Sequence, residues 1–332
     1  MSATIVAFLF AVGVIVVAGA TLTWCADSIA EHTRMGKLFV GSVFLAAATS
    51  LPELTTDLNA IWLDLPDLAV GDLLGSCLFN LLILACVDFV YRSRTRALSR
   101  VAAAHSLAGL VTIALSSLVA IGILIEPRMV SWTVLGIGPA VLAVLMAYLV
   151  GVRLIYVDQQ ASQQAHEAEA SGGSRRLSLR VALLGYLIAV VAVFLAAPML
   201  AASAGHIAEL SGLGETFIGV TLLALTTSLP ELVATIVAVR IGAADLAIGN
   251  IFGSNALNIA ILVPLDAAFS GSLLHAVDQI HAFTCLAVIL ITSVIVVGQL
   301  NRAEKRIMFI EPDAAFVILL VVVSLWVLYV AG

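Results

Sequence analysis

Ten long apolar stretches, separated by short polar breaks, follow one another along the chain. A transmembrane helix needs about 20 mainly apolar residues, so each stretch is long enough to cross a bilayer once. The pattern therefore predicts an all-α polytopic membrane protein with ten transmembrane helices. The expected spans are residues 4–24, 37–61, 68–90, 102–125, 129–155, 180–204, 215–239, 245–268, 281–299 and 313–331.

One hydrophilic stretch, residues 158–178, separates the fifth and sixth spans. It is rich in Gln, Ala, Ser and Gly, a composition typical of a linker. We expect a solvated cytoplasmic tether there, with a regulatory or partner-binding role as the alternative. It divides the chain into a first five-helix half, residues 1–157, and a second five-helix half, residues 179–332.

The composition agrees with a membrane protein and argues against other classes. Of the 332 residues, 62% are apolar and 11% are charged, whereas about a quarter of the residues in a soluble domain are charged. The net charge of −6 and the lack of a basic stretch with interleaved aromatics argue against a nucleic-acid partner. The four cysteines and six histidines are scattered, which predicts neither a disulfide framework nor a resident metal or other cofactor.

The positive charges fall on one side of the predicted membrane. With ten spans, fourteen of the fifteen Lys and Arg residues lie in loops on one face, and Arg128 alone lies on the other. Short cytoplasmic loops carry the excess of Lys and Arg in membrane proteins. The chain is therefore expected in the cell membrane, with both termini on the extracytoplasmic side.

The two halves contain an internal repeat. A shift of 178 positions aligns residues 41–84 with residues 219–262 without a gap, and 19 of the 44 positions are identical. Polar positions are among them, so a shared apolar composition does not explain the match. Because the copies lie five spans apart, the second crosses the membrane in the opposite sense, as in the inverted repeats of secondary transporters.

Each copy carries Thr-Ser-Leu-Pro-Glu within a span, at residues 49–53 and 227–231. A proline inside a helix removes one backbone hydrogen bond, so Pro52 and Pro230 are expected to kink their helices and free a carbonyl group. In hydrocarbon, such a carbonyl group needs a polar partner. The surrounding hydroxyl and carboxylate groups are hard oxygen ligands, which suit Na⁺, Ca²⁺ and similar cations.

Glu53 and Glu231 are the strongest indication of a site. A carboxylate in mid-span costs at least about 2.5 kcal/mol and is usually functional. No Lys or Arg in the interior of the spans is placed to pair with either glutamate, so a cation or a proton has to hold the two together. For a single proline motif, helix packing would be the simpler interpretation.

Each copy continues with Gly-x3-Gly-Ser-x3-Asn, at residues 71–80 and 249–258. Small residues spaced in this way let helices approach closely, and residues four apart share one helix face. One such segment alone would favour contacts between helices. Because the segment is duplicated behind both kinked spans, its Ser and Asn side chains are expected to line the cavity of the glutamates.

These paired segments resemble the α-repeats of the sodium/calcium exchangers, within the calcium/cation antiporter superfamily, and the chain is similar to a short, prokaryotic-type member. The resemblance covers both repeats and the ten-span plan. It implies an antiporter rather than an enzyme, exchanging Ca²⁺ for Na⁺ as the first and sixth spans slide across a rigid core. It also implies that Glu53 and Glu231 are the shared carboxylates of a calcium site. The other implied ligands are hydroxyl, amide or carbonyl oxygens of Ala46, Thr49, Ser50, Ser76, Asn80, Ala224, Thr227, Ser228, Ser254 and Asn258.

The chain departs from the family pattern at several positions. Asn258 stands where many exchangers have an aspartate, and Asp72 and Cys77 stand where asparagine is usual. Asp57, whose equivalent is Thr235, is interpreted either as an extra carboxylate in the outward vestibule or as a satisfied polar residue. Asp72 is interpreted as a helix-start cap. Two ionised glutamates balance one Ca²⁺ or two Na⁺, so a third Na⁺ requires one of these aspartates.

A cation/proton antiporter on the same fold is the alternative function, since a buried glutamate can take up a proton. An intramembrane hydrolase using two acids has less support, because the kinked segments offer no nucleophile and base pair and the chain has no GxGD sequence. A structural or signalling protein with a vestigial site would keep every activity after Glu53→Gln. The oligomeric state is left open.

Overall fold

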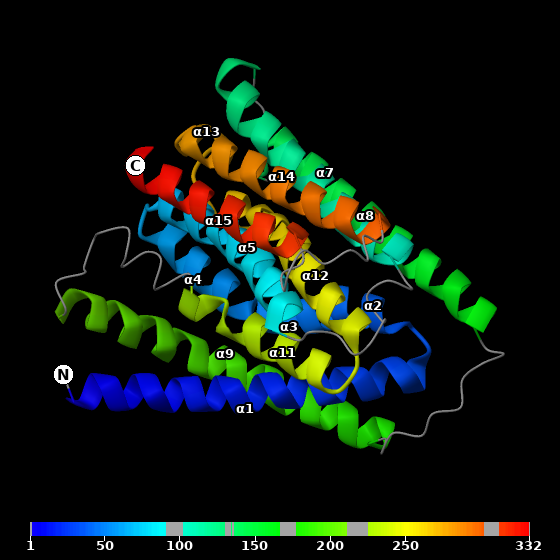
Figure 1. Cartoon of the computed structure of the whole chain (residues 1–332). Coiled ribbons are helices and arrows are strands. Elements are labelled where there is room, and N and C mark those ends of the chain that lie inside the picture. Colours follow the sequence, from blue (N-terminus) through cyan, green and yellow to red (C-terminus); the bar gives the residue numbers. More distant parts are fainter. Residues whose placement is uncertain are drawn as a thin grey trace.

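The computed structural model describes residues 2–90, 102–129, 134, 136–166, 177–210, 225–301 and 312–331, and these residues are mostly helical (Figure 1). Within them, bridge geometry is confined to the pair Val134 and Ile137. The elements are α1 (Ser2–Thr33), α2 (Lys37–Val40), the π-helical turn η1 (Gly41–Leu45), α3 (Ala46–Thr49), α4 (Leu51–Trp62), α5 (Pro66–Val90), α7 (Ala102–Met129), α8 (Pro139–His166), α9 (Leu179–Leu210), α11 (Leu229–Arg240), α12 (Ala244–Ala268), α13 (Leu273–Ala276), α14 (Ile280–Asn301) and α15 (Pro312–Ala331).

Seven of the described helices are long and apolar enough to cross a membrane, or eight if the bent pair Lys37–Thr49 and Leu51–Trp62 is one span. All eight coincide with expected spans. The tenth expected span corresponds to α15, whose apolar part, Ala314–Val330, is shorter than the others. Of the seventh expected span, only the part from residue 225 onward is described. The chain is a multi-pass, all-helical membrane protein.

Several helix boundaries differ from the expected ones, including the end of α1, which lies at Thr33 and not near residue 24. α8 continues to His166, so the first part of the expected linker is helical. Gln and Ala favour helix, which explains how a polar segment extends an apolar helix. α8 also begins only at Pro139, whereas the fifth span was expected from residue 129. Residues 167–176 of the expected linker lie outside the described residues.

Burial separates central helices from peripheral ones. Of the apolar window of α12, 89% is buried, and the figure for α5 is 72%. The corresponding windows of α1 and α9 are only 28% buried, and that of α8 is 22%. Helices α5 and α12 are therefore central, whereas α1 and α9 lie side by side on the outside (Figure 1) and present large apolar side chains to lipid.

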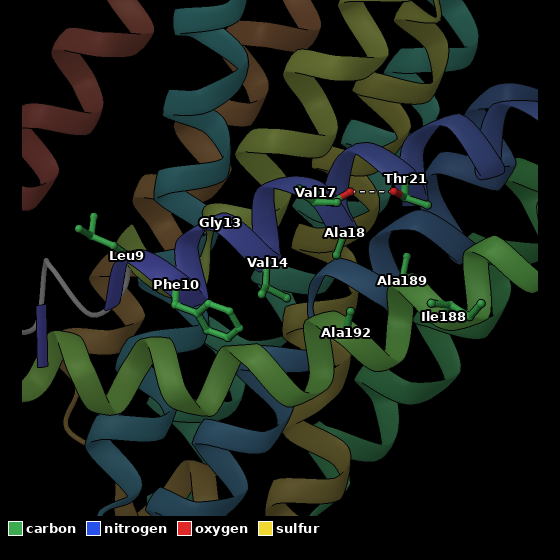
Figure 2. A pocket seen from close by; sticks show the side chains of 10 residues that line it. All are labelled: Leu9, Phe10, Gly13, Val14, Val17, Ala18, Thr21, Ile188, Ala189 and Ala192. Atoms are coloured by element: carbon green, nitrogen blue, oxygen red, sulfur yellow. Dashed lines mark hydrogen bonds between the residues drawn. The ribbon is translucent and has the colours of Figure 1, made fainter. Parts of the chain in front are cut away.

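A groove of about 550 Å³ lies between α1 and α9 (Figure 2). Nine of its ten lining residues are apolar, and the tenth, Thr21, has its hydroxyl bonded to the Val17 carbonyl of the same helix at 2.8 Å. None of the lining residues carries an ionisable side chain. The groove is suited to apolar contacts, and the polar chemistry of the molecule lies elsewhere.

Candidate cation site

The first half of the polar centre is built around a break in the second expected span. Helix α3 ends at Thr49, and the next residue, Ser50, has φ of −88° and ψ of 12°, which depart from helical geometry. Helix α4 then begins with Pro52 in its first turn, a position that proline favours. The two helical pieces are bent by 46°. The π-helical turn η1 precedes the break, and such turns are frequent at functional sites.

The second repeat has the same break at the equivalent residue. Ser228 has φ of −78° and ψ of 6°, and α11 follows with Pro230 in its first turn. Residues 225–227 are helical immediately before the break. A helix break beside each proline is confirmed, and the break at Ser50 carries the bend of 46°. Each break places a buried glutamate, Glu53 or Glu231, in the first turn of the helix that follows.

Two glycines of α12 allow a close approach to the first repeat. A Cβ atom added at Gly253 would collide with the backbone of Ser42, and one added at Gly249 would collide with the carbonyl group of Leu38. Only a glycine hydrogen fits at these points, so α12 lies directly against the backbone of α2 and η1. The small residues of the second repeat therefore allow the close packing expected of them.

This packing interleaves the polar residues of the two repeats. Ser50 Oγ donates to Glu231 Oε1 at 3.2 Å, and Ser254 Oγ donates to the same oxygen at 3.5 Å. Thr49 Oγ1 lies 3.4 Å from Ser254 Oγ. A hydroxyl group from the first break thus donates to the glutamate at the second break.

Glu53 and Glu231 form the negative centre of the site. Both side chains are fully buried, and their charges interact electrostatically. Neither carboxylate oxygen of Glu53, nor Oε2 of Glu231, has a hydrogen-bond partner among the described residues. Breaking or omitting the partner of a buried charge is strongly destabilising, so this pair requires a bound positive charge.

Further buried oxygen and nitrogen atoms nearby have unused hydrogen-bonding capacity. In the described ranges, atoms without a partner include the hydroxyl groups of Ser76 and Ser228, both amide atoms of Asn258, and Asn80 Oδ1. No group of three or more His, Cys, Asp or Glu residues in these ranges has the geometry of a metal centre. The arrangement is two carboxylates among neutral oxygens, which suits an exchangeable hard cation more than a tightly held metal.

Contacts join five of the twelve predicted site residues. Contacts join Thr49, Ser50, Glu231 and Ser254, and the carbonyl group of Ala46 accepts from Ser50 N at 2.9 Å and from Thr49 Oγ1 at 3.3 Å. Ala224 lies outside the described residues. The remaining predicted residues are buried on the helices around the two breaks: Glu53, Ser76, Asn80, Thr227, Ser228 and Asn258.

The interpretation of Asp72 as a helix-start cap is wrong. Helix α5 begins at Pro66, so Asp72 lies in its second turn and the first-turn acid is Asp67. The helix thus begins two residues before residue 68, the expected start of this span. Asp72 and Asp57 are both buried. Asp57 therefore does not line an open vestibule, and it is not a satisfied polar residue either, because neither of its carboxylate oxygens has a hydrogen-bond partner among the described residues.

Asn250 is a positioning residue that sequence reasoning missed. Its Oδ1 accepts from Thr49 Oγ1 at 3.4 Å, while its Nδ2 donates to Thr235 Oγ1 at 3.3 Å and to the Glu231 carbonyl group at 3.5 Å. It links the two breaks without being one of the predicted ligands. The available signal was its place in the repeat, since Asn250 is the equivalent of Asp72.

The chain is similar to proteins of known family. The family model described as sodium/calcium exchanger protein matches residues 3–155 and 181–331. The inner membrane protein YrbG of Escherichia coli (strain K12) is 30% identical over 246 residues, 74% of each chain. The sodium/calcium exchanger MaX1 of Methanosarcina acetivorans is 50% identical over 62 residues, which is 19% of this chain and 18% of that one. A solved structure of the sodium-calcium exchanger NCX_Mj, soaked with 2.5 mM Na⁺ and 10 mM Sr²⁺, has a similar fold, with a TM-score of 0.73, 20% identity and coverage of 97% of this chain and 98% of that chain.

Proposed function

Because the chain belongs to the sodium/calcium exchanger protein family, and is therefore a cation antiporter, we propose that the ions it exchanges are Ca²⁺ and Na⁺. The observation that carries the proposal is the buried pair Glu53 and Glu231, which needs a positive charge and lies among hydroxyl and amide groups. Two carboxylates balance one Ca²⁺ or two Na⁺. The same pocket can therefore hold either ion in turn, which is the requirement for exchange.

The implied ligand set supports alternating occupancy of one pocket. Hydroxyl groups from both repeats donate to Glu231, whereas neither carboxylate oxygen of Glu53 has a donor among the described residues. Ca²⁺ takes six to eight oxygen ligands, so the hydroxyl, amide and carbonyl oxygens of both breaks would complete its shell. Na⁺ ions would use the same oxygens in smaller groups.

The proposal includes ten spans in two inverted five-helix halves, with both termini outside the cell. The equivalent breaks at Ser50 and Ser228, with nearly equal backbone angles, support the internal repeat. The charge asymmetry of the loops supports the orientation. Movement of the peripheral pair α1 and α9 across the central helices would open the site alternately to each side.

The test is Ca²⁺ uptake into proteoliposomes loaded with Na⁺, with vesicles under a pH gradient alone beside them. Uptake driven by outward Na⁺ is expected, and it should fall to the level of protein-free vesicles in Glu53→Gln and in Glu231→Gln. Asp64→Asn, which removes an exposed carboxylate from the same half, is the matched control and should transport normally. Uptake driven only by the pH gradient would establish Ca²⁺/H⁺ exchange instead, and uptake that survives both glutamate changes would refute the site.

A further inference from the structure

A second pair of buried acids lies near the glutamates. Asp57 on α4 is 1% exposed and Asp72 on α5 is 5% exposed. Helices α4 and α5 pack against each other, and the two carboxyl groups interact electrostatically. Ionised carboxylates only accept hydrogen bonds, so neither group can satisfy the other. Both oxygens of Asp57 and Oδ2 of Asp72 have no donor in the described part of the chain.

The second repeat shows what normally joins these two positions. The residues 178 positions later are Thr235 and Asn250. Asn250 Nδ2 donates to Thr235 Oγ1 at 3.3 Å, so an uncharged donor and acceptor close the contact there. The repeat thus brings the same two helix positions together in both copies. In the first copy both residues are acids and the donor is missing.

The neighbouring charges do not supply the missing positive group. Glu53, one turn before Asp57 on α4, interacts electrostatically with Asp57, with Asp72 and with Glu231 on α11, and all four groups are acidic. Ion pairs in the described part of the chain include those of Asp27 and Glu31 with Lys37, of Asp245 with His105 and of Asp67 with His281, and none of these uses Asp57 or Asp72. A positive charge between Asp57 and Asp72 must therefore come from a bound species.

We propose that Asp57 and Asp72 bind one monovalent cation between them, a proton or Na⁺, as an accessory site beside the glutamate pair. The two carboxyl groups offer four oxygen atoms, which suits a single charge better than a divalent ion, because Ca²⁺ takes about six to eight oxygen ligands. With one cation bound, the pair keeps one net negative charge. The occupied aspartate pair and the two glutamates together can therefore balance three positive charges, one more than the glutamates alone. The role of this pair in transport rests on the proposed function.

The double variant D57T/D72N tests the accessory site, because it installs the residue pair that the second repeat already accommodates. Equilibrium binding of ²²Na⁺ to the purified protein and the carboxylic-acid band of its infrared spectrum are measured without Ca²⁺. The wild type should hold one more monovalent cation per chain than the variant. If the cation is Na⁺, the difference appears in the ²²Na⁺ count; if it is a proton, the variant loses a carboxylic-acid band.

Asp64→Asn is the matched control, because Asp64 is exposed and its φ of 60° is well tolerated by asparagine, and it should behave as the wild type. Equal ²²Na⁺ counts and equal carboxylic-acid bands in the wild type and D57T/D72N would overturn the inference. Should the double variant not fold, Asp57→Asn and Asp72→Asn each supply an amide donor to the remaining carboxylate and should show the same loss.

Ca²⁺ uptake by wild-type proteoliposomes, run in parallel, separates this inference from the proposed function. Normal uptake with equal cation counts would refute the accessory site alone. Absent uptake together with a difference of one cation would support the accessory site and refute Ca²⁺/Na⁺ exchange.

Discussion

Cys77 and Asn255, which are 178 positions apart, are joined by two reciprocal hydrogen bonds. Asn255 Nδ2 donates to the Cys77 carbonyl group at 3.3 Å, and Cys77 Sγ donates to the Asn255 carbonyl group at 3.7 Å. The separation equals the shift of the internal repeat. Equivalent positions of α5 and α12 therefore meet, as expected at an axis that relates two copies of one motif.

Replacing Asn255 by leucine should weaken this helix contact. Asn255 Oδ1 also accepts from Asn80 Nδ2 at 3.0 Å, so the change removes the partner of a buried amide as well as the side-chain donor to the Cys77 carbonyl group. The free energy of unfolding should fall by about 1–3 kcal/mol. Thermal unfolding of the detergent-purified protein measures it. Cys77→Ser, which keeps a donor at the same place, should unfold near the wild-type temperature; equal melting of both variants would show that the contact contributes nothing.

Gly253→Ala should damage the packing of α12 against the first repeat. The added methyl group meets the backbone of Ser42, which cannot rotate away as a side chain can. Overpacking of this kind typically costs about 1–3 kcal/mol or more. Gly13→Ala on the lipid-facing side of α1 has no atom within 4 Å of the new Cβ and should be neutral or slightly stabilising. Thermal unfolding of the two variants compares them directly, and equal effects would contradict the close approach.

Ser50→Ala should weaken ion binding without unfolding the protein. The change removes the hydroxyl group that donates to Glu231 Oε1 and that belongs to the proposed ligand set. The apparent affinity for Na⁺ in the uptake assay should fall about tenfold, equivalent to about 1.4 kcal/mol. Ser117→Ala is the control, since Ser117 Oγ donates only within its own helix, to the Ile113 carbonyl group at 2.7 Å. An unchanged Na⁺ dependence in Ser50→Ala would remove this residue from the site.

Lys37→Met should loosen the junction between α1 and α2. Lys37 Nζ lies 2.5 Å from Asp27 Oδ1 and 3.4 Å from Glu31 Oε1, and its side chain is only a third exposed. The loss should be about 1 kcal/mol and should shrink at high salt, because salt screens charges near the surface. Thermal unfolding at two salt concentrations measures both effects. Arg153→Met, at an exposed position on α8, should change stability less; a larger effect there would argue against the ion pairs.

Fusion proteins test the proposed orientation. Alkaline phosphatase attached after residue 332 should be active in a bacterial host, and green fluorescent protein attached there should be dark, because the C-terminus is proposed to lie outside. The same reporters attached after residue 166, at the end of α8, should give the opposite result. If the fusions at both positions gave the same result, the number of membrane crossings between residue 166 and the C-terminus would have to be even and not five as proposed.

The spans, the repeat and the two kinks were predictable because each depends on residues close together in the chain. Apolar runs specify membrane crossing, and the breaks at Ser50 and Ser228 lie beside the prolines of the two Thr-Ser-Leu-Pro-Glu segments, whereas Pro198 and Pro264 lie inside continuous helices. Prediction failed where local signals conflict. The polar beginning of the expected linker also favours helix and extends α8 to His166. Asp72 resembles a helix-start cap in the sequence, but α5 begins at Pro66 and Asp72 lies in its second turn.

The sequence by itself determined the repeat, the position of each glutamate beside a helix break and the shortage of positive charge within the membrane. Only the tertiary structure decided which side chains meet: Ser50 donates to the glutamate of the other repeat, and Asn250 links Thr49 to Thr235. Such contacts depend on the rotation and depth of each helix in the bundle. These are set by the packing of many residues far apart in the chain, such as Gly253 against Ser42, and no local pattern contains them.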